Sequence, residues 1–267
     1  MTTQINDDLR VSWRESGDAS SPALVLLHAF PISSEMWDAQ LAHLGKRFHV
    51  LAPDARGFGD TSPFSGAPLV EQLARDLAAW LDHLEVERAI VGGCSLGGYT
   101  ALEFARQFPN RLRGLILCDT RADADSLEAK VARDQMIAFV RENDGLAVAN
   151  RMLPKLLCDQ TRVNKPEVVE EVREMASGLS GEHAAQMIMA LRERRDSTSV
   201  LSSIRVPTLV IGGEEDAVSP PDVMAQMAEA IENAKHVVVA DAGHLSSLEQ
   251  PQKWNKEVEE WLNRSGL

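Results

Sequence analysis

Short apolar runs alternate along the chain with segments whose apolar residues recur at helical spacing. The first pattern predicts buried strands, and the second predicts amphipathic helices. The predicted strands cover residues 9–13, 23–27, 48–52, 89–91, 115–118, 208–211 and 236–239. The predicted helices include residues 70–84, 96–108, 221–233 and 252–262. Strands and helices that alternate in this way form a mostly parallel sheet with helices on both faces, so we predict an α/β fold.

One long segment breaks the alternation. Residues 121–200 carry helical patterns and charged patches but no convincing strand. The segment also holds five methionines: Met136, Met152, Met175, Met187 and Met189. Two explanations of these methionines stay open. They form either an adaptable apolar wall over a pocket or the ordinary core of a small helical subdomain. We expect a core domain formed by residues 1–120 and 201–267, with residues 121–200 inserted as a helical cap, or lid, over the carboxyl edge of the sheet.

Length and charge narrow the range of partners. A chain of 267 residues suits one α/β domain, with or without an inserted cap. Its 27 basic and 40 acidic side chains give a net charge of -13, which argues against nucleic acid and anionic membrane surfaces as partners. No secretory signal is visible, and no apolar run approaches the ~18 residues of a membrane span, so we expect a cytoplasmic protein. The pattern does not reveal the oligomeric state.

The cysteines give no sign of a metal site or a disulfide framework. Cys94, Cys118 and Cys158 are scattered along the chain and lack the C-x-x-C spacing of zinc and redox motifs. We therefore expect neither a structural zinc ion nor a set of disulfides. No metal or organic cofactor is implied by any other motif.

The five residues from Gly93 to Gly97 spell G-x-S-x-G and carry the strongest chemical signal. They stand between a predicted strand and a predicted helix, which is the setting of a nucleophile elbow. In such a turn a strained backbone pushes the serine hydroxyl out of the sheet, and the glycines leave room for the neighbouring chain. Ser95 is therefore the candidate nucleophile. Cys94 competes for this role, but the residue before an elbow serine points into the fold, so we expect it to pack there.

A serine hydroxyl needs a base that takes its proton, and the base needs a third group that orients it. His244 is the candidate base, because it follows the last predicted strand and Gly243 allows a tight turn before it. Asp216 is the preferred acid, because it keeps the chain order serine, acid, histidine. Asp119 follows the preceding strand and remains the alternative acid. Asp241 is more typical of a turn former.

The negative charge that forms on the substrate oxygen needs backbone N–H donors fixed before the reaction. Leu96 is one candidate donor, because it follows the serine and begins a helix whose dipole favours negative charge. Phe30 is the second, in the loop His28-Ala29-Phe30-Pro31 after the second predicted strand. His28 is either a second base or a side chain that braces this loop, and the bracing role is favoured.

In their order along the chain, these motifs resemble those of the α/β-hydrolase superfamily. The matching segments are residues 28–31, 54–62 and 93–97, the loop at Asp216, and Gly243-His244. The resemblance extends from about residue 9 to about residue 264. It implies the α/β-hydrolase fold, with a helical cap inserted after the sixth core strand, and serine-hydrolase chemistry. Ala29 departs from the family, which more often has glycine there. Its extra methyl group is expected to alter slightly the angle at which the N–H of Phe30 points.

Two motifs are most similar to the branch of 3-oxoadipate enol-lactonases and small carboxylesterases. They are residues 243–251, which read G-H-L-S-S-L-E-Q-P, and residues 118–120, which read C-D-T. The resemblance implies a small-molecule ester or lactone substrate and an acyl-enzyme intermediate. An enol-lactone that bears an acid group needs a cationic contact, for which the candidates are Arg121, Arg151, Arg192, Arg194 and Arg195.

Two further functions stay open on the same fold. If hydrogen peroxide replaces water in releasing the acyl group, the reaction is perhydrolysis, as in related cofactor-free haloperoxidases. A non-catalytic receptor or binding protein can retain the whole triad. A haloalkane dehalogenase is disfavoured, because it needs a carboxylate at the position of Ser95.

Overall fold

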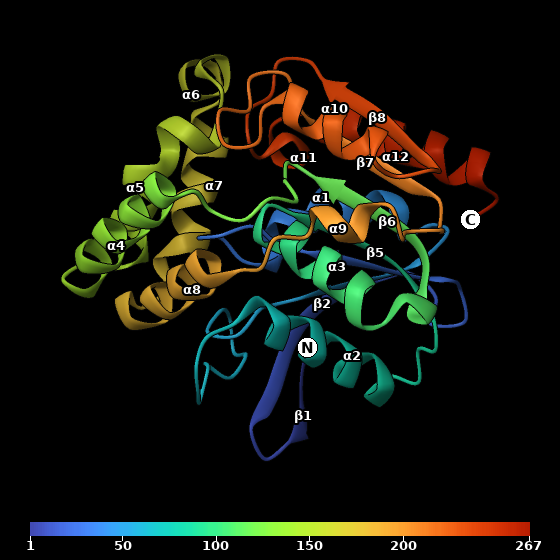
Figure 1. Cartoon of the computed structure of the whole chain (residues 1–267), viewed down its shortest axis with the longest axis horizontal. Coiled ribbons are helices and arrows are strands. Elements are labelled where there is room, and N and C mark those ends of the chain that lie inside the picture. The colour runs from blue at the N-terminus through green and yellow to red at the C-terminus, as the bar shows by residue number, and fades with distance from the viewer.

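Eight strands form one central sheet in the structure, a computed structural model that describes residues 1–267 (Figure 1). Across the sheet the order is β1-β2-β4-β3-β5-β6-β7-β8. β1 (Thr2–Asn6) and β4 (His49–Pro53) both pair antiparallel with β2 (Leu9–Ser16). All other pairs are parallel and involve β3 (Ala23–Leu27), β5 (Ala89–Cys94), β6 (Leu112–Cys118), β7 (Thr208–Gly213) and β8 (Ala234–Val239). The prediction of a mostly parallel sheet is confirmed.

β1 is the strand that the apolar pattern does not predict. Its sequence, Thr-Thr-Gln-Ile-Asn, has one apolar residue, and its side chains alternate between exposed and half-buried. It lies at the edge of the sheet and pairs with β2 alone, so backbone hydrogen bonds rather than apolar burial define it. Several predicted strands are also too short. β5 continues through Gly92 and Gly93, because pairing of the backbone with β3 and β6 does not depend on side chains.

Alternate residues of each strand point to opposite faces of the sheet, and each face has its own apolar cluster. Leu24 and Leu26 belong to one cluster, whereas Val25 and Leu27 belong to the other. The first face packs against η1 (Ser34–Trp37), α1 (Asp38–Leu44) and α12 (Pro251–Ser265). The second face packs against α2 (Val70–His83), α3 (Leu96–Gln107) and α10 (Pro221–Glu229). Helices therefore cover both faces, as predicted (Figure 1).

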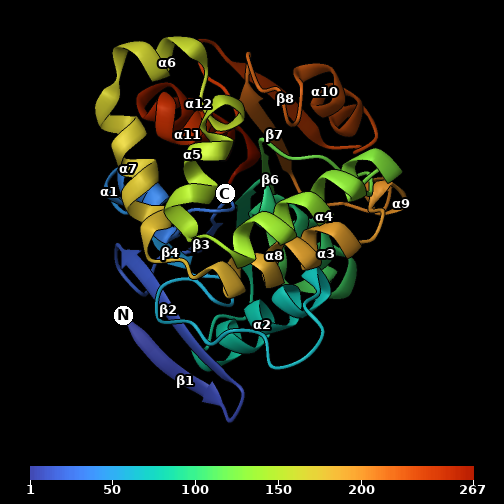
Figure 2. The same ribbon diagram turned by 90° about the vertical axis from the view of Figure 1, so that its left-hand side faces the viewer.

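Between β6 and β7 the chain forms helices alone. They are α4 (Leu127–Arg141), α5 (Gly145–Leu156), α6 (Asp159–Asn164), α7 (Pro166–Ser177), α8 (Gly181–Glu193) and α9 (Thr198–Leu201). Figure 2 looks onto α4, α5, α7 and α8, which stand in front of the sheet. We call α4 to α8 the helical segment. The short α9 lies beside α3 instead and packs with it (Figure 1).

Two short elements remain, η2 (Pro109–Arg111) and α11 (Ser246–Glu249). The helices α4 and α12 are the longest, with 15 residues each. None of the helices combines the length and the apolar character that crossing a membrane requires. The division of the chain into a core domain and a cap over residues 121–200 stays a prediction.

Candidate active site

Ser95 sits on a sharp turn between β5 and α3, with φ 52° and ψ -107°. A positive φ is unfavourable for a residue with a side chain and costs about 1–3 kcal/mol. The flanking glycines make this turn possible. A Cβ on Gly93 would lie 2.1 Å from the carbonyl carbon of Gly97, and a Cβ on Gly97 would lie 2.1 Å from the carbonyl oxygen of Leu27. Neither position has room for any side chain, which is the geometry of a nucleophile elbow.

His244 and Asp216 form a buried pair. Nδ1 of His244 lies 2.9 Å from Oδ2 of Asp216, and both residues are almost completely buried. The other oxygen of Asp216 accepts hydrogen bonds from the N–H groups of Val218 and Ser219, at 2.7 and 2.9 Å. Burial opposes ionisation of Asp216, but the attraction of His244 and these hydrogen bonds outweigh it and lower the pKa of the carboxyl. An ionised carboxylate only accepts hydrogen bonds, so Nδ1 carries the proton and Nε2 is free to accept one.

The structure does not join Ser95 to this pair by a hydrogen bond between its hydroxyl and the ring of His244. The link between them is instead the side chain of Cys94, the residue before Ser95, whose Sγ lies 3.7 Å from the carbonyl oxygen of His244. Hydrogen bonds between a nucleophile and its base are often loose before substrate binds. His244 and Asp216 are therefore in direct contact. Ser95 is linked to His244 through Cys94, the preceding residue of the chain.

The backbone N–H groups of Phe30 and Leu96 are available as oxyanion donors. Neither takes part in the hydrogen bonds of the loops and caps, and Leu96 begins α3, where an N–H has no acceptor within the helix. The N–H of Gly97 donates to the carbonyl oxygen of His28 at 3.1 Å, which ties the start of α3 to the loop of Phe30. The two candidate donors thus belong to one connected piece of backbone.

His28 uses both of its ring nitrogens on the backbone. Nδ1 lies 2.9 Å from the carbonyl oxygen of Ala29, and Nε2 accepts a hydrogen bond from the N–H of Ala55 at 2.9 Å. The ring also packs edge-on against Phe58, with the ring centres 4.7 Å apart. Burial lowers the pKa of His28, so the ring stays neutral. Because no nitrogen is left for Ser95, these contacts correspond to the bracing role rather than to a second base.

The two other acids weighed from the sequence do not contact His244. Asp119 is fully buried, and its carboxyl oxygens accept hydrogen bonds from the N–H of Gly213 at 2.8 Å and from the hydroxyl of Ser246 at 2.6 Å. Asp241 sits on an exposed turn, with φ 59°, and pairs with Lys253 at 2.8 Å. The acid that touches the histidine is therefore Asp216.

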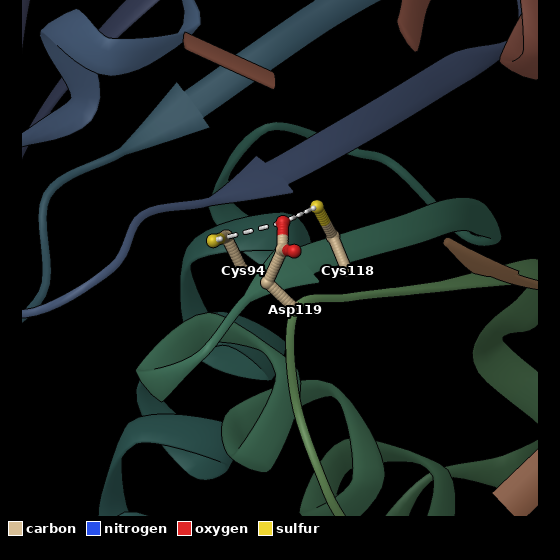
Figure 3. Close-up of side chains that lie close together, drawn as sticks. All are labelled: Cys94, Cys118 and Asp119. Carbon is tan, nitrogen blue, oxygen red and sulfur yellow. Dashed lines mark hydrogen bonds between the residues drawn. The ribbon is translucent and has the colours of Figure 1, made fainter. Parts of the chain in front are cut away.

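Cys94, Cys118 and Asp119 lie together at the ends of β5 and β6 (Figure 3), with their donor atoms within 4.8 Å of one another. Such a group is a candidate for holding a metal ion, but its atoms already have partners. The carboxyl accepts the bonds described above, and the indole N–H of Trp254 donates to Sγ of Cys118 at 3.3 Å. Burial raises the pKa of the Cys94 thiol, which makes it a poor nucleophile. These contacts are those of a packed interior.

An apolar cluster joins the two candidate oxyanion donors to the helical segment. Phe30 and Leu96 belong to the same buried cluster as Ile137 of α4, Val148 of α5 and Met187 of α8. Three more methionines of the segment pack against it: Met136, Met152 and Met189. Apolar side chains of the helical segment therefore share one buried cluster with both candidate oxyanion donors.

Two side chains inside the motifs 118–120 and 243–251 support the site, although the sequence pattern indicated no individual role for them. Thr120 donates its hydroxyl hydrogen to the carbonyl oxygen of Ser95 at 3.0 Å. Ser246, two residues after His244, binds the carboxyl of Asp119. Both hydroxyl residues are buried, and their membership of these motifs was the signal in the sequence that could have indicated them.

Fold and site together define an α/β hydrolase. The chain belongs to the alpha/beta hydrolase fold family, whose profile matches residues 22–251. It is 32% identical to 3-oxoadipate enol-lactonase 2 of Acinetobacter baylyi, over 96% of this chain and 94% of that protein. The resemblance inferred from the motifs is confirmed, and the protein is a hydrolase of this family.

Solved structures give the same result. A malate-bound thermophilic esterase from Thermogutta terrifontis is 40% identical, with a TM-score of 0.93, over 99% of this chain and 97% of that chain. The enol-lactonase from Burkholderia xenovorans LB400 is 29% identical, with a TM-score of 0.89, over 96% of this chain and 98% of that chain. Both an esterase and a lactonase therefore share the full length of the fold.

Proposed function

We propose that this hydrolase cleaves a small, neutral carboxylic ester or lactone through Ser95, His244 and Asp216. The contact of 2.9 Å between His244 and Asp216 carries the proposal, because it leaves Nε2 of the histidine free to take a proton. The strained turn at Ser95 supports it, since it presents a hydroxyl beside unpaired N–H groups. The similarity to an esterase and to enol-lactonases supports the same class of substrate.

The reaction has two halves. Oγ of Ser95 attacks the carbonyl carbon while its proton passes to Nε2 of His244, and the N–H groups of Phe30 and Leu96 hold the oxygen that becomes negative. The tetrahedral intermediate then collapses, and the leaving oxygen takes the proton from His244. Water attacks the acyl-enzyme with His244 again as the base, which releases the acid and restores Ser95. Asp216 holds the ring and stabilises its charged form throughout.

The charges near the helical segment favour a neutral substrate. Four of the five arginines considered as partners for an anionic group are already paired with carboxylates of the chain: Arg121 with Asp123, Arg192 with Asp134, Arg194 with Asp125, and Arg195 with Glu71. Arg151 has no carboxylate partner, and its guanidinium lies 4.5 Å from the ring centre of Phe139. An anionic enol-lactone is the second candidate because of the similarity to enol-lactonases, and it would depend on Arg151.

Replacing the nucleophile tests the proposal. Ser95→Ala is expected to lower turnover of p-nitrophenyl acetate by about 10⁶-fold. The matched control is Ser177→Ala, an exposed serine at the end of α7, which is expected to keep full turnover. A phosphonofluoridate is expected to add its mass to the wild type and to the control but not to Ser95→Ala.

Each other outcome has a defined meaning. Turnover that survives Ser95→Ala would show that the assignment of the nucleophile is wrong. A wild-type protein that neither hydrolyses esters nor becomes labelled would favour a non-catalytic binding protein. Peracid formed from acetate and hydrogen peroxide would indicate perhydrolysis in place of hydrolysis.

A further inference from the structure

The tripeptide Cys118-Asp119-Thr120, at the end of β6, contacts all three loops that carry the proposed catalytic side chains. Its first contact is with the serine turn. The N–H of Ser95 donates to the carbonyl oxygen of Cys118 at 3.0 Å, and the hydroxyl of Thr120 donates to the carbonyl oxygen of Ser95 at 3.0 Å. Both backbone polar groups of Ser95 therefore bond to this tripeptide, and the carbonyl oxygen also accepts from the N–H of Tyr99 at 3.0 Å. A residue with an unfavourable φ depends on such contacts to keep its conformation.

Asp119 makes the second contact, with the end of β7, which leads to Asp216. Its N–H donates to the carbonyl oxygen of Ile211 at 2.9 Å, and its Oδ1 accepts from the N–H of Gly213 at 2.8 Å. The N–H of Asp216 in turn donates to the carbonyl oxygen of Gly213 at 3.3 Å. A displacement of Gly213 would therefore displace the backbone of Asp216.

The third contact is with the histidine loop. Oδ2 of Asp119 accepts from the hydroxyl of Ser246 at 2.6 Å and lies 3.3 Å from the N–H of the same residue. Ser246 follows His244 by two residues. The carboxyl of Asp119 thus bonds through Oδ1 to the strand end that leads to Asp216, and through Oδ2 to the loop of His244.

No cationic side chain is paired with the buried carboxyl of Asp119. Its Oδ2 lies 2.9 Å from Sγ of Cys118 and 4.0 Å from Sγ of Cys94 (Figure 3). Burial, with the nearby Cys118 and Asp216, raises the pKa of Asp119 well above its usual value. A raised pKa favours the protonated form, and a protonated carboxyl both donates and accepts hydrogen bonds, as an amide does.

We propose that Asp119 is a positioning residue that keeps the loops of Asp216 and His244 aligned with the turn of Ser95. The inference rests on the proposed function, because it assigns Asp119 a role in that reaction. The carboxyl bonds neither to the hydroxyl of Ser95 nor to the ring of His244, so it acts through the backbone that carries them. Removing it misplaces the reacting groups, which lowers kcat and leaves KM nearly unchanged.

The test compares kcat and KM for p-nitrophenyl acetate in Asp119→Ala, Asp119→Asn and Ser246→Ala. The matched control is Thr208→Val, because Thr208 is also fully buried but lies at the opposite end of β7, where its hydroxyl donates to the carbonyl oxygen of Val206 at 3.1 Å. Asp119→Ala is expected to lower kcat about 10²-fold, with KM within about twofold. Ser246→Ala, which removes one of these bonds, is expected to lower kcat about tenfold.

The conservative variant separates hydrogen bonding from charge. Asp119→Asn keeps the bond from Gly213 and can donate to the hydroxyl oxygen of Ser246, but it loses the bond from the Ser246 N–H. Its kcat is therefore expected to fall less than in Asp119→Ala, and to stay within about fivefold of the wild type. Thr208→Val is expected to keep the wild-type kcat even where the thermal midpoint falls. If Asp119→Ala does not fold, Ser246→Ala decides: a lower kcat at unchanged KM supports positioning, and an unchanged kcat overturns it.

Three further results overturn the inference. The first is an unchanged kcat in both Asp119→Ala and Ser246→Ala while Ser95→Ala is inactive, an outcome that leaves the proposed function standing. The second is a loss in Asp119→Asn as large as in Asp119→Ala, because the negative charge would then be required. The third is a kcat loss of the same size in Thr208→Val. Turnover that survives Ser95→Ala is the separate result that removes the proposed function.

Discussion

Oδ2 of Asp216 lies 2.9 Å from Nδ1 of His244, in a part of the protein where both side chains are buried. The N–H groups of Val218 and Ser219 hold the second oxygen of the carboxylate, so its orientation is set by the backbone. The charge of Asp216 is kept although burial opposes it, because the histidine and these donors lower the pKa of the carboxyl. A fixed, charged acid of this kind selects one tautomer of the histidine ring.

Asp216→Asn is expected to lower kcat for p-nitrophenyl acetate by about 10⁴-fold, by analogy with the same substitution in a serine protease. The carboxylate of Asp216 only accepts hydrogen bonds, so it keeps the ring proton on Nδ1. An amide can also donate a hydrogen bond, and it therefore permits the wrong tautomer of the ring. Glu215→Gln is the matched control, because Glu215 is an exposed acid one residue before Asp216, and it is expected to keep the wild-type rate. A loss of less than about tenfold in Asp216→Asn would contradict the assigned role.

His28 is expected to make stability depend on pH. Burial lowers its pKa below the ordinary value of 6.5, so the folded protein takes up this proton at a lower pH than the unfolded chain does. The contribution of neutral His28 is complete above about pH 6.5 and is lost as the pH falls from there towards the folded pKa. In this window the free energy of unfolding falls by up to about 1.4 kcal/mol per pH unit for this group.

Urea unfolding of the wild type and of His28→Gln, at several pH values between 7.5 and 5, measures this effect. The variant has no imidazole at position 28, so its free energy of unfolding is expected to change less with pH than that of the wild type. His83→Gln, which alters an exposed histidine, serves as the control and is expected to follow the wild type. Equal slopes for His28→Gln and the wild type would contradict the prediction.

Gly97→Ala is expected to damage both stability and turnover. Its Cβ would lie 2.1 Å from the carbonyl oxygen of Leu27, and a backbone atom cannot move aside as a flexible side chain does. We expect a loss of about 1–3 kcal/mol in the free energy of unfolding, together with misplacement of Ser95. Gly178→Ala is the control, because nothing lies within 4 Å of its added Cβ, and the change there is expected to stay within about 1 kcal/mol. A stable and fully active Gly97→Ala would contradict the account of the turn.

The substrate preference is expected to favour neutral esters. The test compares p-nitrophenyl acetate with the mono-p-nitrophenyl ester of succinate, which has the same leaving group and an added negative charge. We expect kcat/KM to be at least about tenfold higher for the neutral ester, a difference of ~1.4 kcal/mol in transition-state binding. A preference for the succinate ester that disappears in Arg151→Gln would instead support the anionic alternative.

Much of the fold could be predicted from local patterns. Buried runs such as 23–27 define strands because their apolar side chains leave water on both faces of the sheet. The pattern failed for β1, whose polar residues belong to a strand only because β2 offers them a backbone partner. It also ended strands and helices at the wrong residue, as in α10, which stops at Glu229 rather than continuing to residue 233.

The sequence by itself determined the parts of this protein that depend on neighbouring residues. The turn at Ser95 needs glycines at positions 93 and 97, and Leu96 follows the serine at the start of a helix, so both could be recognised from a few letters. The order of strands and helices could be predicted in the same way, because each element shows its own pattern of apolar residues.

Only the tertiary structure decided which acid meets His244. Asp119 and Asp216 both follow strands, and β6, β7 and β8 are neighbours in the sheet, so the chain order allowed either. In the fold, the carboxyl of Asp119 lies among Cys118, Gly213 and Ser246, whereas that of Asp216 reaches the ring of His244. Hydrogen bonds between side chains far apart in sequence depend on how strands pack and where each side chain points. No local pattern of residues contains that information.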